Sequence, residues 1–420
     1  MRIAVLGAGI SGLAAAHSLA SRAEVVVFEA RDRAGGNIHT GDLDGCRVEW
    51  GPNGFLDNEP ATLELVTELG LTARLQPADG AAARRFLWRE GRLREIPSKP
   101  QGFLASSCLP LAARLRALAE PFVRSKSVGD ESVFEFARRR LGRGIAETLV
   151  DGMVTGVFAG DPRRLSVAAA FPRLHALEAE HGSLIRGARG RGFGPVGHLT
   201  SFDDGLQVLV EALTRRLDVR FGTVVDDLSE LLAEGFDHVL CTLPATRAAD
   251  LVTGELGSLL RRISTAPVVV VALVFEASAP VPQAFGFLSP HGQGLEILGA
   301  LCDSAIFPGR APAGKHLVRV LIGGRRNAAA VELQDHRLID LAFANLERAW
   351  GPLPAPTAHG VFRHRLGIAQ YERGHSSLLR EIESRCPPHL RLAGSSYRGL
   401  ALNACVREAR SWAPWELERP

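Results

Sequence analysis

Closely spaced cysteines are absent from this sequence of 420 residues. No two of its cysteines form a Cys-x-x-Cys pair; the six are Cys46, Cys108, Cys241, Cys302, Cys386 and Cys405. This spacing indicates neither a disulfide framework nor a zinc site. Widely separated single thiols fit a reducing cytosol.

A large excess of one charge and a long apolar run are also absent. The net charge of +3 gives no argument for nucleic acid as a partner. The most apolar stretch, residues 266–275, is shorter than the roughly 18 residues that cross a membrane, and its β-branched composition predicts a buried strand. The chain starts directly in a predicted strand, without the pattern of a secretory signal. We expect a cytoplasmic protein that does not cross a membrane.

An ordered set of glycines stands near the start of the chain. Residues 2–6 predict a buried parallel strand, residues 11–21 a helix, and residues 24–29 a second buried strand that ends at Glu29. The turn before the helix carries a G-x-G-x-x-G motif, formed by Gly7, Gly9 and Gly12. This βαβ unit predicts a dinucleotide site, in which the glycines admit a pyrophosphate to the helix N-terminus and Glu29 binds ribose hydroxyls.

A second pair of glycines indicates which dinucleotide is bound. Arg33 can meet the phosphates of a long flavin dinucleotide, and Gly35 and Gly36 let the backbone pass under its ribityl chain. A plain NAD site has no need for this loop. Residues 49–55, with the sequence EWGPNGF, form a further glycine turn that can face an isoalloxazine ring. We therefore predict FAD as the cofactor.

The length of the chain predicts two or three domains. The further predicted elements, in chain order, are a hairpin at 84–97, helices between 98 and 175, a helix at 203–217, a strand at 237–244 and a strand-rich region at 265–369. One of the helices is predicted to start at an Asp130 cap and to end at Gly142. The last fifty residues predict a strand, a glycine turn and a helix that give a flavin pocket its second wall.

Six stretches carry a resemblance to a known family. They are GAGISGLAAAHSL, GPNGFLDNEPATLELVTELGL, TGVFAGDPRRLSVAAAFPRL, FGFLSP, YERGH and GSSYRGLALNAC. Nearly end to end, the chain resembles the protoporphyrinogen oxidases, a family of amine-oxidase-like flavoproteins that acts late in haem biosynthesis. The resemblance implies that a porphyrinogen loses six hydrogens in three two-electron steps, that FAD accepts hydride at N5, and that dioxygen is the electron acceptor and leaves as hydrogen peroxide.

The resemblance also implies an α/β fold in three parts. These are a Rossmann-type FAD-binding domain at 1–80, 206–264 and 370–420, a mixed-sheet substrate domain at 81–88, 176–205 and 265–369, and an α-helical, membrane-associating domain at 89–175. In the helical part, residues 103–126 carry an apolar stripe flanked by basic residues, which suits either a bilayer interface or a core helix with a solvated face. The family allows a homodimer and a place on the inner face of the cell membrane.

The resemblance assigns the flavin, and no side chain, to the chemical step. It implies that Arg85 anchors a propionate, since an arginine fork suits a carboxylate. An apolar pocket for the macrocycle is implied at Gly156, Val157, Phe285, Leu288 and Leu321. The implied FAD contacts are Gly7, Gly9, Gly12, Glu29, Arg33, Gly35, Gly36, Gly51, Pro52, Asn53, Val225, Gly394, Tyr397, Gly399, Leu400, Ala401 and Leu402. No metal site is expected.

The sequence departs from the family pattern at Ala369, Asp204 and Ala404. We expect these changes to leave FAD binding intact and to affect the turnover rate. Three other functions stay open beside protoporphyrinogen oxidation. They are oxidation of coproporphyrinogen III, binding of porphyrin by a flavoprotein with little turnover, and amine oxidation, which would call for an aromatic cage.

Overall fold

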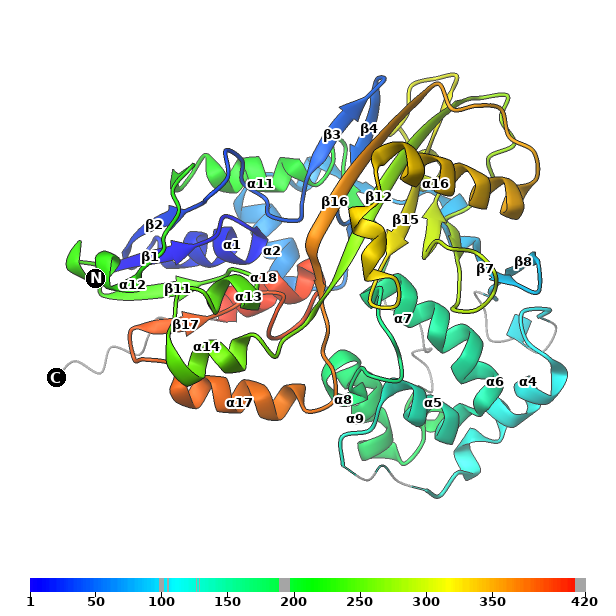
Figure 1. Ribbon diagram of the computed structural model, residues 1–420, viewed down its shortest axis with the longest axis horizontal. Coiled ribbons are helices and arrows are strands. Elements are labelled where there is room, and N and C mark those ends of the chain that lie inside the picture. Colours follow the sequence, from blue (N-terminus) through cyan, green and yellow to red (C-terminus); the bar gives the residue numbers. More distant parts are fainter. Residues whose placement is uncertain (98–101, 104–105, 126, 128, 189–196, 412–420) are drawn as a thin grey trace.

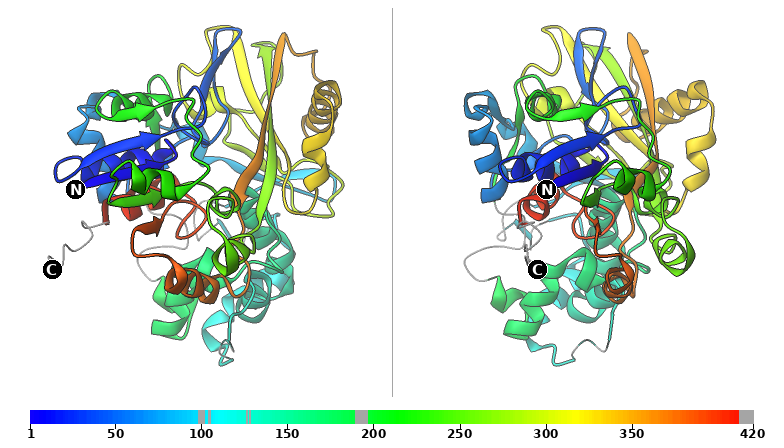
Figure 2. Two further views of the ribbon diagram at one scale, coloured as in Figure 1. Left: turned by 60° about the vertical axis from the view of Figure 1, so that its left-hand side comes forward. Right: turned by 90° about the vertical axis from the view of Figure 1, so that its left-hand side faces the viewer.

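The computed structural model describes residues 1–97, 102–103, 106–125, 127, 129–188 and 197–411. Figure 1 shows three regions around a shared centre: a parallel sheet with helices on both sides, a tall sheet of long strands, and a group of helices below that sheet. Figure 2 shows the same regions from two further directions, with the helical group at the bottom in both.

The first sheet is parallel throughout and contains the N-terminal strand at its centre. Its apolar strands are buried on both faces, as expected for a parallel sheet covered by helices. In spatial order the strands are β10 (Asp218–Arg220), β2 (Glu24–Phe28), β1 (Arg2–Leu6), β11 (His238–Cys241) and β17 (Leu390–Leu392). The predicted return of residues 237–244 to the first sheet is confirmed as β11.

Two layers of helices cover this sheet, each with its own apolar core. One layer contains α1 (Ile10–Leu19), α2 (Pro60–Glu68), α11 (Gln207–Thr214) and α18 (Leu402–Ser411). The other contains α12 (Leu228–Ala233), α13 (Ala245–Ala248), α14 (Gly254–Leu260) and α17 (His375–Arg385). The helix predicted at 203–217 is shorter than expected, because its first four residues form a turn that includes Gly205 at a φ of +89°.

The second sheet is mixed, since β13 pairs parallel with β7 while its other pairs are antiparallel. In spatial order it contains β16 (Ala358–Ala369), β12 (Thr265–Glu276), β15 (Lys315–Gly323), β14 (Gly299–Leu301), β13 (Gly286–Leu288), β7 (Arg85–Arg89) and β8 (Arg92–Glu95). The predicted hairpin at 84–97 is confirmed as β7 and β8, and the apolar run 266–275 lies within β12. The long helix of this region was not predicted: α16 (Asp335–Trp350) packs its apolar side on the sheet.

The helical region has a core of its own, which includes Phe136, Val154 and Leu184. Its elements are α4 (Leu111–Leu118), η3 (Glu120–Phe122), α5 (Val133–Leu141), α6 (Arg143–Ile145), η4 (Ala146–Val150), α7 (Asp151–Phe158), α8 (Val167–Ala170), α9 (Pro172–His181) and α10 (Leu184–Gly187). The Asp130 cap was a wrong prediction. Ser132 is the N-cap of α5 and forms a capping box with Glu135, whereas Asp130 accepts hydrogen bonds from Ser166 and the Gly374 amide. Gly142 ends α5 as predicted.

Short strands connect the two large sheets. The hairpin of β3 (Thr40–Leu43) and β4 (Cys46–Glu49) stands beside β16 in Figure 1, and its buried residues pack on the strands β12 and β15. A small sheet joins β5 (Phe55–Leu56), β9 (Leu199–Phe202) and β6 (Leu75–Pro77). The remaining short elements are η1 (Thr72–Arg74), η2 (Gly80–Ala83), α15 (Asp303–Ile306) and η5 (Ala328–Glu332). Within the described residues, no helix has both the length and the apolar character needed to cross a bilayer.

Candidate functional site

The turn between β1 and α1 forms a close-packed cradle at a helix N-terminus. Gly7 adopts a φ of +97°, and a Cβ on Gly12 would lie 2.0 Å from the Gly7 carbonyl oxygen. Gly9 is the N-cap of α1 and supplies no side-chain cap. A Cβ on Gly9 would meet only the Gly36 Cα, at 4.0 Å, so space remains above the turn. Free helix amides beside open space suit a bound phosphate.

Glu29 lies directly beside this turn and is buried. Its carboxylate accepts hydrogen bonds from the Ala8 amide at 2.8 Å and the Arg31 amide at 3.0 Å. A carboxylate offers about four acceptor positions, so capacity remains for two ribose hydroxyls. The Thr223 amide donates to the Glu29 carbonyl oxygen. Val225, two residues later, is half-buried and lies next to the same end of the sheet.

Arg33 binds its own loop. Its guanidinium donates to the carbonyl oxygens of Ala34, Gly36 and Ile38 at 3.1 to 3.3 Å. Desolvation by burial lowers the pKa of this guanidinium. Gly35 donates its amide to the Ala8 carbonyl at 2.7 Å, so the loop lies against the first turn. These three donors of Arg33 therefore shape the loop, a role that the sequence interpretation did not include.

The turn that contains Gly51, Pro52 and Asn53 lies close to the same loop. A Cβ on Gly51 would lie 1.8 Å from the Asn37 carbonyl oxygen, so the position admits only glycine. Both polar atoms of the Asn53 amide are buried and have no hydrogen-bond partner among the described residues. An unpartnered buried amide is costly unless a ligand or water pairs with it. The edge of an isoalloxazine ring carries donors and acceptors, so these residues fit FAD.

The late turn between β17 and α18 packs on the first turn. Gly394 has a φ of +103°, and a Cβ there would lie 3.3 Å from the Ser11 hydroxyl in the first turn of α1. The Tyr371 hydroxyl spans the late turn, because it donates to the Ser395 carbonyl at 2.7 Å and accepts from the Gly399 amide at 2.8 Å. The predicted residues of this turn are Gly394, Tyr397, Gly399, Leu400, Ala401 and Leu402. The two predicted walls of the cofactor site thus meet at the start of α1.

A buried acid that sequence reasoning missed lies behind the late turn. Glu408 on α18 accepts a hydrogen bond from the Gly394 amide at 3.1 Å, and its side chain is only 10% exposed. Its Oε1 atom has no hydrogen-bond partner among the described residues, and the Arg398 guanidinium is 3.8 Å away. Desolvation by burial raises the pKa of Glu408 to about 7.

Predicted substrate residues gather where β7, β13 and α7 meet. The Arg85 guanidinium lies over the Phe285 ring, 4.7 Å from its centroid, and desolvation lowers the pKa of Arg85. A Cβ on Gly156 would lie 2.8 Å from Leu288, so α7 packs closely on β13. Val157 is half exposed. The fold therefore assembles a wall of one cation, an aromatic ring and aliphatic side chains.

Leu321 belongs to the neighbouring part of the same sheet. Its carbonyl oxygen accepts from the Leu298 amide at 2.8 Å, and its side chain packs in a small cluster with Ala159 and Val268. Leu298 in turn accepts from the Ser289 amide at 2.9 Å, one residue after Leu288. A short chain of contacts thus connects Leu321 to the wall at β13.

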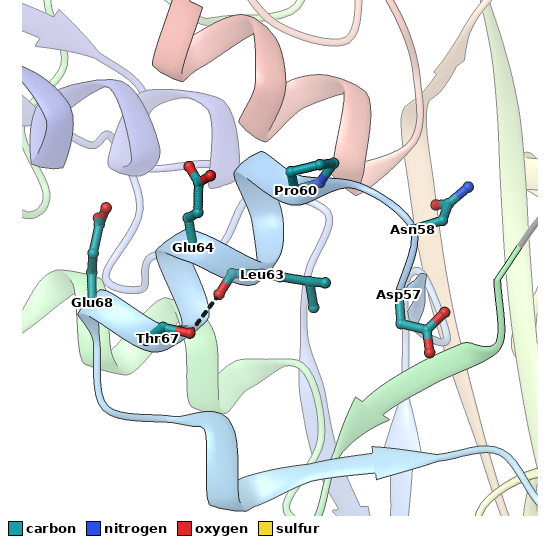
Figure 3. A pocket seen from close by; sticks show the side chains of 7 residues that line it. All are labelled: Asp57, Asn58, Pro60, Leu63, Glu64, Thr67 and Glu68. Atoms are coloured by element: carbon teal, nitrogen blue, oxygen red, sulfur yellow. Dashed lines mark hydrogen bonds between the residues drawn. The ribbon is translucent and has the colours of Figure 1, made fainter.

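A separate hollow of about 580 Å³ lies on the outer side of α2. Figure 3 shows its lining, with Asp57 and Asn58 before the helix and Glu64 and Glu68 along it. None of the predicted site residues lines it. Its three carboxylates lie near cationic partners, since Arg410 pairs with Glu64 and Glu68 and His198 lies 3.5 Å from Asp57.

Two further polar side chains beside the site escaped sequence reasoning, Arg319 on β15 and His364 on β16. Arg319 has apolar neighbours on both sides in β15, whereas His364 lies between Arg363 and Arg365 in β16 and has no such signal. A charged residue inside an apolar strand is a usable signal, because an unpaired buried charge is costly. The signal does not reveal the partner, which lies far away in the sequence.

Comparisons with known proteins agree with this geometry. Residues 10–413 match the family described as flavin containing amine oxidoreductase. The chain is similar to protoporphyrinogen oxidase of Homo sapiens, with 34% identity over 98% of this chain and 97% of the human protein. It is similar to coproporphyrinogen III oxidase of Bacillus subtilis (strain 168), with 28% identity over 97% and 96%. A crystal structure from Exiguobacterium sp. 255-15, provisionally named a protoporphyrinogen oxidase, shares a TM-score of 0.85 and 25% identity over 97% of both chains.

Proposed function

The chain belongs to the flavin-containing amine oxidoreductase family, and on that premise we propose that it oxidises protoporphyrinogen IX to protoporphyrin IX. It is an FAD-dependent oxidoreductase of porphyrin biosynthesis. The observation that carries the choice of substrate is the 34% identity to the human protoporphyrinogen oxidase along nearly the whole chain. Three two-electron steps remove six hydrogens from the macrocycle.

The residues of this chain bind the cofactor and orient the substrate, and the cofactor supplies the redox chemistry. When bound, FAD accepts hydride at N5 and passes the electrons to dioxygen, which leaves as hydrogen peroxide. The free amides of the first turn of α1 would hold the pyrophosphate, Glu29 would hold the ribose, and the unpartnered Asn53 amide would pair with the flavin. The late turn from Gly394 to Leu402 would form the opposite wall of the FAD site.

The proposed substrate wall provides one charge and apolar area. Among the described residues Arg85 forms no ion pair, so its guanidinium is available to a propionate, and the Phe285 ring beneath holds it in place. Leu288, Val157 and the close approach of Gly156 exclude water from the macrocycle face. A dry pocket with one basic anchor suits a large apolar ligand with carboxylates at one side.

The test is a turnover measurement on the purified yellow protein. We expect anaerobic protoporphyrinogen IX to bleach the flavin absorption, and admission of oxygen to restore it with one peroxide per two electrons. A protein that stays yellow with every porphyrinogen contradicts the proposal. Porphyrin binding without bleaching or peroxide would identify a porphyrin-binding flavoprotein instead.

Coproporphyrinogen III is the second candidate substrate, favoured by the similarity to the Bacillus subtilis enzyme. It carries two more carboxylates than protoporphyrinogen IX and so calls for more basic anchors. The ratio of kcat/KM on the two porphyrinogens decides between them. We expect the ratio to favour protoporphyrinogen IX.

We also propose that the protein is cytoplasmic and docks on an anionic membrane through α4 and η3. Leu111, Leu115, Leu118 and Phe122 are 57%, 54%, 45% and 80% exposed, which is unusual for large apolar side chains in one place. Figure 1 shows α4 at the outer edge of the helical region. Arg124 is exposed next to this apolar face and complements lipid phosphates. Lys126, a flanking residue in the sequence interpretation, lies outside the described residues.

Dioxygen as the acceptor and a homodimeric assembly complete the proposal. Stoichiometric peroxide release tests the acceptor. Light scattering of the purified holoprotein tests the assembly, for which a monomer mass would be the contrary result.

A further inference from the structure

Side chains from the second sheet hold the turn that follows β4. Arg319 on β15, only 2% exposed, donates through Nη1 to the carbonyl oxygens of Glu49 and Gly51, the latter at 3.1 Å. His364 on β16 lies with Nε2 2.7 Å from the Trp50 carbonyl oxygen. Three consecutive carbonyl groups of this turn are therefore bound by two side chains that come from strands about 270 to 314 residues later.

The Arg319 guanidinium is itself fixed. Its Nε and Nη2 atoms donate to the two carboxylate oxygens of Asp303 on α15, with Nη2 at 3.0 Å. A forked pair of this kind defines the plane of the guanidinium as well as its position. Because the Asp303 side chain is as buried as that of Arg319, at 2% exposure, water does not compete for the pair.

His364 acts as a neutral donor. Desolvation by burial lowers the pKa of His364, so the ring is uncharged at neutral pH. A ring nitrogen that faces a carbonyl oxygen must carry the hydrogen, which sets the Nε2–H tautomer. The Phe362 ring, 4.8 Å from the imidazole centroid and stacked on Trp50 at 6.0 Å, keeps the imidazole in place.

The strand that carries Arg319 also carries a proposed substrate contact. Alternate residues of a strand point to the same face, so Arg319 and Leu321 share one face of β15. The turn that Arg319 binds continues into Gly51, Pro52 and Asn53, the proposed flavin contacts. One guanidinium thus joins the substrate side of the site to its cofactor side.

We propose that Arg319 and His364 are positioning residues, which set the place of the cofactor-facing turn 49–53 relative to the substrate strands. This inference rests on the proposed function, because that function assigns the turn to the flavin and β15 to the porphyrinogen. Hydride transfer needs reacting atoms about 3 to 3.5 Å apart, and a misplacement of about 1 Å can cost about 100-fold in rate. Without these two side chains the second sheet would no longer hold the turn, and the distance between the turn and the substrate strands would not be fixed.

The test removes the donors while keeping the charge balance and the packing. In Arg319→Met with Asp303→Leu, a buried ion pair is replaced by apolar side chains, an exchange that is often neutral for stability. The matched control is Arg140→Met with Glu120→Gln, which removes a fully buried pair in the helical region. His364→Leu and His364→Gln form a second comparison, since only glutamine can still donate to the Trp50 carbonyl.

Two measurements are made on the bound flavin, its visible circular dichroism and the Kd for FAD. Two more use the porphyrinogen, the rate of anaerobic flavin reduction and the KM, so that a loss of rate can be told from a loss of binding. We expect Arg319→Met with Asp303→Leu to change the flavin dichroism and to slow reduction about tenfold or more, with KM within about twofold. We expect the Arg140 control to match the wild type, His364→Leu to shift the dichroism, and His364→Gln to restore it.

Wild-type dichroism and reduction rate in the Arg319 double variant would overturn the inference. If that variant fails to fold, the His364 pair decides, and identical dichroism in the leucine and glutamine variants would overturn it. The flavin dichroism and the Kd for FAD need no substrate. A wild type that oxidises no porphyrinogen therefore contradicts the proposed function, while those two measurements still decide the role of the turn.

Discussion

At the scale of single residues, Arg85 is the proposed anchor for a propionate of the substrate. Its guanidinium lies over an aromatic ring rather than beside a carboxylate, whereas the neighbouring Arg84 lies 3.5 Å from Glu95. We expect Arg85→Ala to raise KM for the porphyrinogen about tenfold, because a charge-assisted hydrogen bond contributes about 1.5 to 3 kcal/mol. Steady-state kinetics measures this, with FAD content unchanged.

Arg84→Ala is the matched control for that substitution and is expected to leave KM near the wild-type value. An unchanged KM in Arg85→Ala would remove this residue from the substrate site.

The raised pKa of Glu408 predicts that the stability of the protein depends on pH. Burial raises its pKa from 4.5 to about 7 in the folded state, so folding favours the protonated form. The contribution of this carboxyl is most favourable below about pH 4.5 and is lost as the pH rises towards 7. We expect the free energy of unfolding of Glu408→Gln to rise relative to that of the wild type across this window, by at most about 3 kcal/mol at pH 8.

Denaturant unfolding at pH 5, 6, 7 and 8 measures the difference. The groups around Glu408 are Arg398, Arg407, Cys405, Tyr371 and Tyr397. They are present in both proteins, so their own titration cancels. Stability curves that run parallel over this range would show that Glu408 does not titrate there.

At the scale of elements, the contact between β1 and α1 depends on Gly12. A Cβ there would lie 2.0 Å from the Gly7 carbonyl oxygen and 2.8 Å from the Thr242 hydroxyl, so α1 would have to move away from the sheet. We expect Gly12→Ala to yield protein with little bound FAD and a free energy of unfolding lower by about 1 to 3 kcal/mol. Absorbance of the purified protein at flavin wavelengths measures the first effect.

Gly80→Ala is the control for the added methyl group, because a Cβ at Gly80 would meet nothing within 4 Å. A Gly12→Ala protein with full flavin content would refute the cradle at this turn.

The helix α4 exposes its leucines and buries little of its own surface. Only Ala117 of this helix is buried, and the exposed leucines offer area to a lipid surface. We expect the wild type to float with liposomes that contain anionic lipid, and Leu111→Glu with Leu115→Glu to stay in the aqueous fraction while retaining turnover. Leu333→Glu, at another exposed leucine, is expected to float like the wild type. A wild type that does not float contradicts membrane docking.

At the scale of the whole molecule, the proposed cofactor site is made from both ends of the chain. The first turn, the loop at Gly35, the turn at Gly51 and the late turn at Gly394 come from distant segments that meet beside α1. In Figure 1 the last helix, α18, lies next to the first, α1. A ligand that contacts all of these segments stabilises the folded state as a unit.

We therefore expect removal of FAD to lower the melting temperature, and added FAD to restore it. At a free FAD concentration of 100 times Kd, the stabilisation is about 2.7 kcal/mol. Calorimetry of the deflavinated protein over a series of FAD concentrations measures it. A melting temperature that does not respond to FAD would contradict a site built from both termini.

The sequence alone determined the parts whose causes are local. The βαβ unit, the hairpin at Glu90 and Gly91, the buried strand β12 and the closing strand, turn and helix all follow from periodicity and glycine placement. It failed where two local signals compete, as at Asp130, where Ser132 forms the better cap, and at α16, which a strand-rich neighbourhood concealed.

Tertiary structure alone decided which distant groups meet. No local pattern pairs Arg319 with the carbonyl groups of Glu49 and Gly51, or the Glu408 carboxylate with the Gly394 amide. Arg33 is different, because its guanidinium binds the carbonyl oxygens of Ala34, Gly36 and Ile38 within its own loop. Periodicity and turn chemistry act over a few residues, whereas the pairing of buried charges depends on how the two large sheets pack, and only the folded chain fixes that.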